Sequence, residues 1–598
     1  MVKLSDYVID FIADLGVRHI FMVAGGGAMH LNNSLGQSKR IKFVCNLHEQ
    51  ASAIAAEAYA RVTNNLGVAL VSTGPAGTNT VTGVAAAWLD STPCLFISGQ
   101  VKRANLKDSY GVRQLGVQEI GIVSIVKSIT KYSVTVMDPY QIHYHLERAV
   151  FLAKSGRPGP VWLDIPLDVQ ASMIDIKKLK SFKKPNNSFG LAGEQLKKKV
   201  TKVIDLLNAS ERPVLLAGNG IRLAGGKDDF LSLVNKLKIP VLTTLLGLDL
   251  IPDAHKLFFG RPGGIASRGA NFTLQNSDFL LSIGARLDMA MVGYAYDKLA
   301  RVAKKVIVDI DPLEINKIST DIDIPVCADA KLFIEEMLRQ KDTLKQKLRN
   351  RWLERCLEWK TKYPVVLPKH RSLKKYVSTY VFADILSDEL KGSDIIVPTS
   401  AGFCSELFFL SFRAKKGQRI FHNRGTGSMG LAIPSSIGAC LASGLKRTIC
   451  LEGDGGFQFN TQELATIKRL KLPIKIFVFN NRGYASIRSS QMRYFGNKVG
   501  ADRSSGLTFP DTIKIAKAYG LKTESILNHF TMKSRIRRVL DTPGPILCEV
   551  MIKPDEIRAP VLSTRQQSDG TMVSSPLEDL WPFLPRKEFL SNMIIPTV

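Results

Sequence analysis

The chain has 598 residues, of which 45% are hydrophobic and 22% are charged, as is usual for globular proteins. This length is too great for a single domain, and about three to four domains are expected. The sequence has 81 Lys and Arg residues against 53 Asp and Glu residues, which gives a formal net charge of +28. These basic residues are dispersed or gather near inferred domain boundaries, with no aromatic residues interleaved. The pattern favours a solvated surface that attracts anionic substrates over a nucleic-acid-binding face.

Local patterns also address the cellular setting. No apolar run reaches the length of a membrane-spanning helix. The first residues, 1–17, have the pattern of an amphipathic helix and lack the features of a signal peptide. The eight cysteines are scattered without CxxC pairs, which favours reduced, buried thiols over disulfides or a zinc site. We therefore expect a cytoplasmic protein with no membrane partner.

The first predicted domain covers residues 1–172. Its apolar runs alternate with helical segments, which is typical of a doubly wound parallel sheet. The runs that we expect to be strands include 19–24, 43–47, 68–73, 93–99 and 161–165. A basic, polar linker follows at 173–193.

The same alternation continues through the rest of the chain. Residues 194–338 predict a middle domain, and a charged helical linker at 339–371 leads to a third domain at 372–555. The tail at 556–598 lacks clear periodicity and is rich in Pro, Ser and Gly, which favours an ordered, lid-like loop. The expected fold class is α/β, with three doubly wound parallel-sheet domains and this tail.

The most specific motif of the chain lies in the third domain. An apolar strand at 448–452 leads into an acidic turn, Gly453-Asp454-Gly455. A helical segment at 461–470 and a second strand at 474–479 follow, and that strand runs into Asn480-Asn481. Both turns are therefore expected at the same edge of a parallel sheet, where open α/β sheets bind ligands.

The residue types in these turns suit a metal-bound diphosphate. The carboxylate of Asp454, the amide oxygen of Asn481 and a nearby backbone carbonyl form a set of hard oxygen ligands. Such a set suits Mg²⁺ whose remaining ligands are phosphate oxygens and water. Gly455 and Gly456 let the backbone approach a diphosphate closely. Either turn alone is ordinary, so the prediction rests on the pair.

The pair resembles the motif of the thiamine-diphosphate-dependent decarboxylase and acetolactate synthase family. The resemblance extends over nearly the whole chain, through the segments 43–61, 68–100, 157–170 and 422–439. It implies pyrimidine-binding, middle and diphosphate-binding domains. It also implies a thiamine diphosphate cofactor anchored by Mg²⁺ on Asp454, Asn481 and the carbonyl of Gly483. In such enzymes two subunits complete one site, so a homodimer or homotetramer is expected.

Two further residues gain roles from this resemblance. Glu49 falls where the family has its catalytic glutamate, which drives tautomerisation of the cofactor's aminopyrimidine. The alternative is a glutamate placed at a helix N-terminus by the macrodipole. Glu57, deeper in the same helix, is expected to be structural. Met429 resembles the residue that wedges between the two cofactor rings, with the Gly427 carbonyl accepting a bond from the amine. Its alternative is a gap-filling core methionine.

The remaining site residues are also implied by the resemblance. Cofactor contacts are expected from Pro75, Asn79, Ala401, Gly402, Phe403, Gly453, Gly455, Gly456, Tyr484 and Ala485. Polar positions near the reacting carbon are expected at Gln100 and Gln118, and Gly26 lies in a glycine-rich turn that replaces the family's usual proline-glycine turn. Substrate contacts are expected at Gly27, Lys127, Ile487 and Arg488, where the Lys127 cation suits the carboxylate of a 2-oxo acid.

Departures from the family pattern refine the expected activity. Ile487 stands about where simple decarboxylases carry a proton-donating glutamate, and their adjacent histidines are missing from the first domain. Both absences favour carbon–carbon bond formation over aldehyde release. We expect a carboligase that decarboxylates a short 2-oxo acid, pyruvate or 2-oxobutyrate, and transfers the acyl-carbanion equivalent to a carbonyl acceptor.

Alternatives remain open on this sequence. A 2-oxo acid decarboxylase and a flavin-dependent 2-oxo acid oxidase would use the same scaffold, and the high charge motivates an inactive regulatory relative. The middle domain resembles one that binds FAD in acetolactate synthases. After Arg286, however, the chain reads LDMAMVGY and departs from the FAD-binding types. This departure disfavours tightly bound FAD without excluding it.

Overall fold

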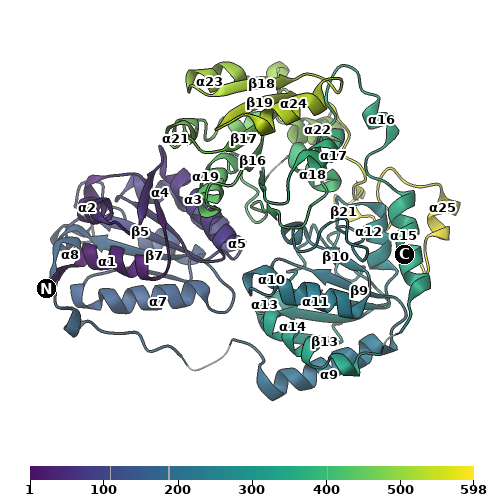
Figure 1. Cartoon of the computed structure of the whole chain (residues 1–598), viewed down its shortest axis with the longest axis horizontal. Coiled ribbons are helices and arrows are strands. Elements are labelled where there is room, and N and C mark those ends of the chain that lie inside the picture. The colour runs from purple at the N-terminus through teal and green to yellow at the C-terminus, as the bar shows by residue number, and fades with distance from the viewer. Residues whose placement is uncertain (108–109, 186–188, 346, 401, 598) are drawn as a thin grey trace.

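The computed structural model of the protein describes residues 1–107, 110–185, 189–345, 347–400 and 402–597. Across these residues, three parallel sheets with flanking helices form three lobes (Figure 1). This confirms the expected α/β class with three doubly wound parallel-sheet domains. The residue ranges assigned above to domains, linkers and tail stay predictions.

The sheet of the first domain has six parallel strands in the order β3-β2-β4-β5-β7-β6. Helices cover both faces, since residues of α3 (Glu49–Thr63) pack on one face and residues of α1 (Leu4–Asp14) and α7 (Ile142–Lys154) on the other. Strands buried on both faces must be apolar throughout, which explains the runs in the sequence. The strands are β2 (His19–Met22), β3 (Lys42–Cys45), β4 (Gly67–Val71), β5 (Cys94–Gln100), β6 (Tyr132–Thr135) and β7 (Val161–Pro166).

The third domain repeats this topology. Its strands follow the order β15-β14-β16-β17-β19-β18, so both domains read 2-1-3-4-6-5 when each is numbered from its own first strand. The strands are β14 (Ile395–Pro398), β15 (Arg419–Ile420), β16 (Thr448–Gly453), β17 (Ile474–Asn480), β18 (Lys522–Ile526) and β19 (Ile546–Met551).

Equivalent helices join these two domains. In each, the helix after the second strand lies at the contact: α3 packs against α19 (Ala432–Ala442). The helices approach so closely that a Cβ on Gly438 would lie 2.0 Å from the carbonyl oxygen of Ala55. A glycine is therefore required at this point of α19.

The middle domain has a five-stranded parallel sheet in the order β10-β9-β11-β12-β13. Residues of α9 (Gly193–Ala209), α11 (Lys227–Leu237) and α14 (Ala330–Arg339) cover one face. Residues of α12 (Arg268–Gln275) and α15 (Asn350–Lys362) cover the other. The strands are β9 (Pro213–Ala217), β10 (Val241–Thr243), β11 (Phe279–Ile283), β12 (Lys304–Asp309) and β13 (Ile324–Cys327).

The tail combines an exposed hairpin with a segment that packs on the middle domain. A small hairpin of β20 (Thr564–Gln566) and β21 (Met572–Ser574) is largely exposed. Beyond it, the helix α25 (Arg586–Ser591) lies beside α15 (Figure 1). Leu577, Leu580 and Phe589 are buried in the core of the middle domain. The indole N–H of Trp359 donates to Asn592 at 2.9 Å. The apolar residues that dock here have no regular spacing, so no periodic pattern predicted this contact.

Within the described residues, no helix combines the length and the apolar character that crossing a bilayer requires.

Candidate active site

The acidic turn and the Asn-rich turn lie side by side at one edge of the third sheet, as predicted. Strands β16 and β17 pair in parallel, with Gly453 opposite Phe479. Asp454 begins a short helix, α20 (Asp454–Phe457), that the sequence pattern did not predict. One oxygen of the Asp454 carboxylate accepts from the N–H of Gly455 at 2.9 Å, and the other accepts from the N–H of Gly483 at 3.0 Å. This second bond ties the two turns together.

The donor groups present fit a magnesium ion. Asn481 is buried; its Nδ2 donates to the Cys404 sulfur at 3.5 Å, while its Oδ1 is buried without a hydrogen-bond partner. A buried, unpaired amide oxygen is costly unless a ligand binds it. Burial raises the pKa of the Asp454 carboxyl to about 6, against the bonds from backbone N–H groups that lower it. A bound cation would satisfy the amide oxygen and stabilise the ionised carboxylate.

No cluster of three or more His, Cys, Asp or Glu side chains suited to a metal occurs among the described residues. The single carboxylate of Asp454 would therefore need the Asn481 oxygen, a carbonyl oxygen and external oxygens to complete a coordination shell. This requirement matches a Mg²⁺ ion that shares its shell with phosphate and water.

Close neighbours leave no room for a side chain at Gly455 and Gly456, the two residues after Asp454. A Cβ on Gly455 would lie 2.3 Å from a ring carbon of Tyr484 and 3.2 Å from the methyl carbon of Met429. A Cβ on Gly456 would lie 2.3 Å from the carboxylate of Glu452. The fold thus brings Met429 and Tyr484, which lie far apart in the sequence, together over Gly455.

The other predicted cofactor contacts border these turns. Gly427 and Gly402 both have left-handed backbone angles, with φ of 57° and 86°, and a Cβ on Gly427 would lie 3.8 Å from the Ser400 carbonyl oxygen. Phe403 begins α18 (Phe403–Ser411) and Ala485 begins α22 (Ala485–Phe495). Ala401 lies outside the described residues.

Glu49 begins α3 and lies beside the C-terminal end of a second helix. Asn79, the last residue of α4 (Pro75–Asn79), donates from Nδ2 to Glu49 Oε2 at 2.9 Å. The carboxylate is half-buried. The preceding residues contact the third domain of the same chain, since Asn46 Nδ2 donates to Glu463 at 2.9 Å. Among the described residues, no hydrogen bond joins Glu49 to Asp454 or Asn481.

Gln100 is buried and its amide is fully engaged. Oε1 accepts from the Thr73 hydroxyl and from the N–H of Val101, each at 2.9 Å. Nε2 donates to the Ile120 carbonyl at 3.0 Å and to Asp164 at 3.1 Å. With both ends engaged, Gln100 braces the segments around it and has little capacity left for a ligand.

Asp164 is a residue that the sequence reasoning missed. It is fully buried under the first-domain sheet edge, where it also accepts from the Ser98 hydroxyl at 2.6 Å. Burial raises its pKa to about 7, although its bonds to Ser98, Gln100 and Thr135 oppose the shift. An acidic residue inside the apolar run 161–166 was the signal that could have found it.

The polar turns of the first domain pack tightly on one another. Gln118 has a left-handed φ of 61° and an exposed side chain. Its carbonyl oxygen would lie 2.4 Å from a Cβ on Gly74. In the glycine-rich turn, the N–H of Gly27 donates to the Ser72 hydroxyl at 3.1 Å, while a Cβ on Gly26 would meet nothing within 4 Å. Gly26 therefore leaves open space where a side chain would stand.

The predicted substrate positions fall in two environments. Lys127 is exposed, and Ile487 is 47% exposed on α22. Arg488 on the same helix is turned inward, where its guanidinium donates to the carbonyls of Asn481 at 3.2 Å and Pro554 at 2.5 Å. Arg488 therefore holds the Asn-rich turn in place.

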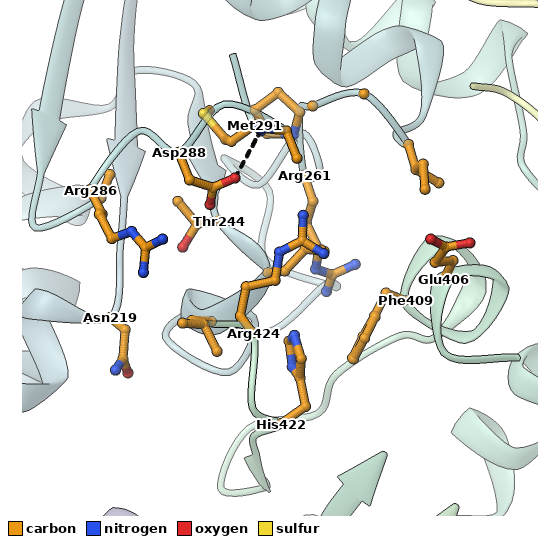
Figure 2. Close-up of a pocket in the computed structure, with 18 of the residues that line it drawn as sticks. Asn219, Thr244, Arg261, Arg286, Asp288, Met291, Glu406, Phe409, His422 and Arg424 are labelled. Carbon is orange, nitrogen blue, oxygen red and sulfur yellow. Dashed lines mark hydrogen bonds between the residues drawn. The ribbon is translucent and has the colours of Figure 1, made fainter. Parts of the chain in front are cut away.

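A cavity of about 900 Å³ lies between the three domains. Arg261, Arg286 and Arg424 extend toward it, beside His422 and Phe409 (Figure 2). Arg286 has a left-handed φ of 57°, a conformation that is costly outside glycine and is often found at ligand sites. Burial lowers the pKa of His422 well below its usual value. Acidic residues such as Asp288 and Glu406 line the cavity as well (Figure 2). The volume and the arginines together suit a ligand of nucleotide size whose phosphates meet those arginines.

Comparison with known proteins places this geometry in a family. Residues 2–125 match the N-terminal TPP binding domain of thiamine pyrophosphate enzymes, residues 200–337 match the central domain, and residues 401–550 match the C-terminal TPP binding domain.

Three relatives similar along most of their length are acetolactate synthases. A probable acetolactate synthase large subunit of Methanocaldococcus jannaschii is 32% identical over 560 residues, which are 93% of this chain and 92% of that protein. The acetolactate synthase large subunit of Lactococcus lactis is 32% identical over 575 residues, covering 94% and 95%. The chloroplastic acetolactate synthase 1 of Nicotiana tabacum is 31% identical over 569 residues, covering 94% and 83%. The chain therefore belongs to the thiamine pyrophosphate enzyme family, among proteins similar to acetolactate synthase large subunits.

Proposed function

We propose that this protein is a thiamine-diphosphate- and Mg²⁺-dependent carboligase of the acetolactate synthase type. It would decarboxylate pyruvate or 2-oxobutyrate and join the acyl-carbanion equivalent to a carbonyl acceptor. The observation that carries the proposal is the meeting of the Asp454 and Asn481 turns with Met429 and Tyr484 around Gly455. It is supported by similarity to acetolactate synthase large subunits along nearly the whole chain.

Asp454, Asn481 and the Gly483 carbonyl would hold Mg²⁺ and, through it, the diphosphate. When bound, thiamine diphosphate supplies a nucleophilic carbon and an electron sink. Glycines at 455 and 456 would let the backbone approach the diphosphate closely. Their neighbours Tyr484 and Glu452 leave no room for a side chain at either position. Met429 presents a flexible apolar side chain above the same glycines, which suits support of the cofactor rings.

Glu49 would exchange a proton with the aminopyrimidine ring. Asn79 donates to Glu49 Oε2, which fixes the carboxylate and leaves Oε1 for the proton transfer. The Asn79 bond also favours one orientation of the acid before the cofactor binds. Position and orientation of the acid are therefore supplied by two helix ends of the first domain.

On the substrate side, Lys127 offers a cation for the 2-oxo acid carboxylate. Gly26 leaves open space near the expected reacting carbon, which admits an acceptor beside the donor. Gln118 and Gly27 belong to the same group of turns. Ile487 supplies no proton, which favours ligation over aldehyde release.

We further propose a cytoplasmic homodimer or homotetramer whose active sites lie between subunits. Glu49 is half-buried and makes no hydrogen bond to the Asp454 turn among the described residues. Near the start of α3, Phe43 and Leu47 are 50% and 57% exposed, which leaves apolar area for a partner subunit.

The cavity between the domains keeps a second candidate function open. Its volume and its arginines would accommodate FAD, and a flavin-dependent 2-oxo acid oxidase would then use the same scaffold. The LDMAMVGY segment after Arg286 departs from FAD-binding relatives, so we rank this function second.

One experiment separates these functions. The purified protein is incubated with thiamine diphosphate, Mg²⁺ and a panel of 2-oxo acids, while carbon dioxide and products are followed by NMR. Carbon dioxide with a matching amount of ligation product is the expected result. Aldehyde without ligation would indicate a decarboxylase, and a yellow protein that forms peroxide would indicate the oxidase. No consumption of any 2-oxo acid would overturn the proposal.

A further inference from the structure

One buried carboxylate of the first domain is bonded to a loop of the third domain. Asp90 lies directly after α5 (Val81–Leu89), and its side chain is fully shielded from solvent. Oδ2 accepts from Asn423 Nδ2 at 2.9 Å and from the N–H of Arg424 at 2.8 Å. Oδ1 accepts from the N–H of Gly425 at 2.8 Å. Asp90 therefore bonds to three consecutive residues of another domain.

A buried ion pair with Arg61 holds Asp90 in place. Arg61 Nη2 donates to Asp90 Oδ2 at 2.7 Å, and the same guanidinium pairs with Glu57. Arg61 also donates to the His422 carbonyl at 3.2 Å, one residue before the loop segment that Asp90 binds. The two carboxylates raise the pKa of Arg61, although its burial opposes this. The loop is thus bound from the first domain by a charged acceptor and a charged donor.

The loop is also shaped to reach Asp90. A Cβ on Gly425 would lie 2.3 Å from Cβ of Leu89 and 3.0 Å from Asp90 Oδ1. Only glycine lets the backbone approach α5 this closely. The close backbone approach and the hydrogen bonds are therefore two independent observations that the loop has one fixed position.

The fixed position of this loop also determines where the residues expected to touch the cofactor lie. Asn423 Oδ1 accepts from the N–H of Thr426 at 3.2 Å, and its own N–H donates to the Ser400 hydroxyl at 3.0 Å. Gly427 follows immediately, and Met429, two residues later, reaches Gly455 of the acidic turn. The segment from Asn423 to Met429 is thus fixed at one end by Asp90 and extends to the diphosphate turn at the other.

We propose that Asp90 is a positioning residue for the thiamine ring system: it holds residues 423–425, and so sets where the Gly427 carbonyl and the Met429 side chain stand. The inference rests on the proposed function, because it gives this loop the role of supporting the rings. Asp90 and the Asp454 turn lie in different domains. A change at Asp90 should therefore weaken the contacts with the cofactor rings and leave the binding of the diphosphate unchanged.

The first test examines the contact itself in the protein without cofactor. Hydrogen–deuterium exchange of the Arg424 and Gly425 amides is compared between wild type and D90N. The expected result is at least tenfold faster exchange at these amides in D90N. Unchanged protection would overturn the inference, whatever the enzyme's reaction is.

The second test separates the two ends of the cofactor. With Mg²⁺ present, D90N should bind thiamine diphosphate at least tenfold more weakly than wild type. Its affinity for inorganic diphosphate should change less than twofold. G425A displaces the same loop without altering any charge and should give the same split, so it carries the test if D90N does not fold.

A matched control separates positioning from general loss of stability. Asp394 is an equally buried acid of the third domain that accepts from Arg447 at 2.6 and 2.9 Å. D394N should lower the melting temperature without changing the ratio of the two affinities. Equal ratios for D90N, G425A, D394N and wild type would overturn the inference while leaving the proposed function intact. A wild-type protein that binds no thiamine diphosphate would overturn both.

Discussion

The first and third domains share one strand order but differ in how their strand-end turns use polar groups. In the first domain, Gln100 is hydrogen-bonded at both ends of its amide and Asp164 is enclosed by donors. In the third domain, the oxygen of Asn481 is buried without a partner beside the carboxylate of Asp454. One topology therefore provides a closed hydrogen-bond network in one copy and, in the other, an unsatisfied oxygen at the proposed ion site. Unsatisfied groups, rather than the scaffold, indicate where the diphosphate binds.

The largest effect should come from the open site. D454A removes the only carboxylate of the proposed magnesium site, so thiamine diphosphate binding and activity should fall at least a thousandfold. Calorimetric titration with Mg²⁺ and thiamine diphosphate measures the loss. The equivalent position after the third strand of the first domain is Ser72, and S72A should change activity less than tenfold. Similar losses in both variants would remove the proposed difference between the two sheet edges.

Within α3, two glutamates should separate catalysis from stability. E49Q should lower turnover at least a hundredfold while thiamine diphosphate still binds, because the amide cannot exchange the proton. E57Q disturbs the buried pair with Arg61 and should instead lower the free energy of unfolding by about 2 kcal/mol. Steady-state kinetics and thermal denaturation of both variants test this. Full turnover in E49Q would contradict the assignment of Glu49.

The closed network predicts a pH dependence of stability. The pKa of Asp164 is about 7 in the folded protein, above the value near 3.9 of a free aspartate, so the folded state binds the proton more tightly. Its stabilising contribution is complete below pH about 4 and is lost as the pH rises through 7, by on the order of 4 kcal/mol. D164N, which cannot ionise, should therefore gain melting temperature relative to wild type between pH 5 and pH 8. A difference independent of pH would show that Asp164 is already ionised in the folded protein.

The smallest effect concerns the contact between the two domains. G438A places a methyl group against the Ala55 carbonyl and should cost about 1–3 kcal/mol, as overpacking usually does. Chemical denaturation would measure this loss. G444A gives a control, because a Cβ on Gly444, just beyond the same helix, would meet nothing within 4 Å. Gly444 has a left-handed φ of 72°, so any loss of stability in G444A reflects a backbone cost. The loss in G438A should instead reflect the contact between α3 and α19.

Much of the fold followed from local sequence. Strands buried on both faces leave continuous apolar runs, so the three sheets and the adjacency of the Asp454 and Asn481 turns were predictable. The meeting of Met429 with Tyr484 over Gly455 was not, since it depends on how three loops approach one another. The partners of Asp90 in the third domain lie more than 330 residues away along the chain, and no local pattern encodes them. The hydrogen bonds of the Gln100 amide likewise depend on tertiary contacts. The family resemblance therefore implied only that Gln100 lies near the reacting carbon, and not that both ends of its amide are already bonded.

The docking of the tail has a consequence for synthesis. Leu577, Leu580 and Phe589 complete a core whose other members begin near Val214. A growing chain can therefore finish the first domain long before the middle domain is covered. During that interval the apolar face around Trp352 and Trp359 lacks its final layer, and it is available to chaperones or to unwanted association. The synthesis of residues 577–589 thus determines when the core of the middle domain is fully covered.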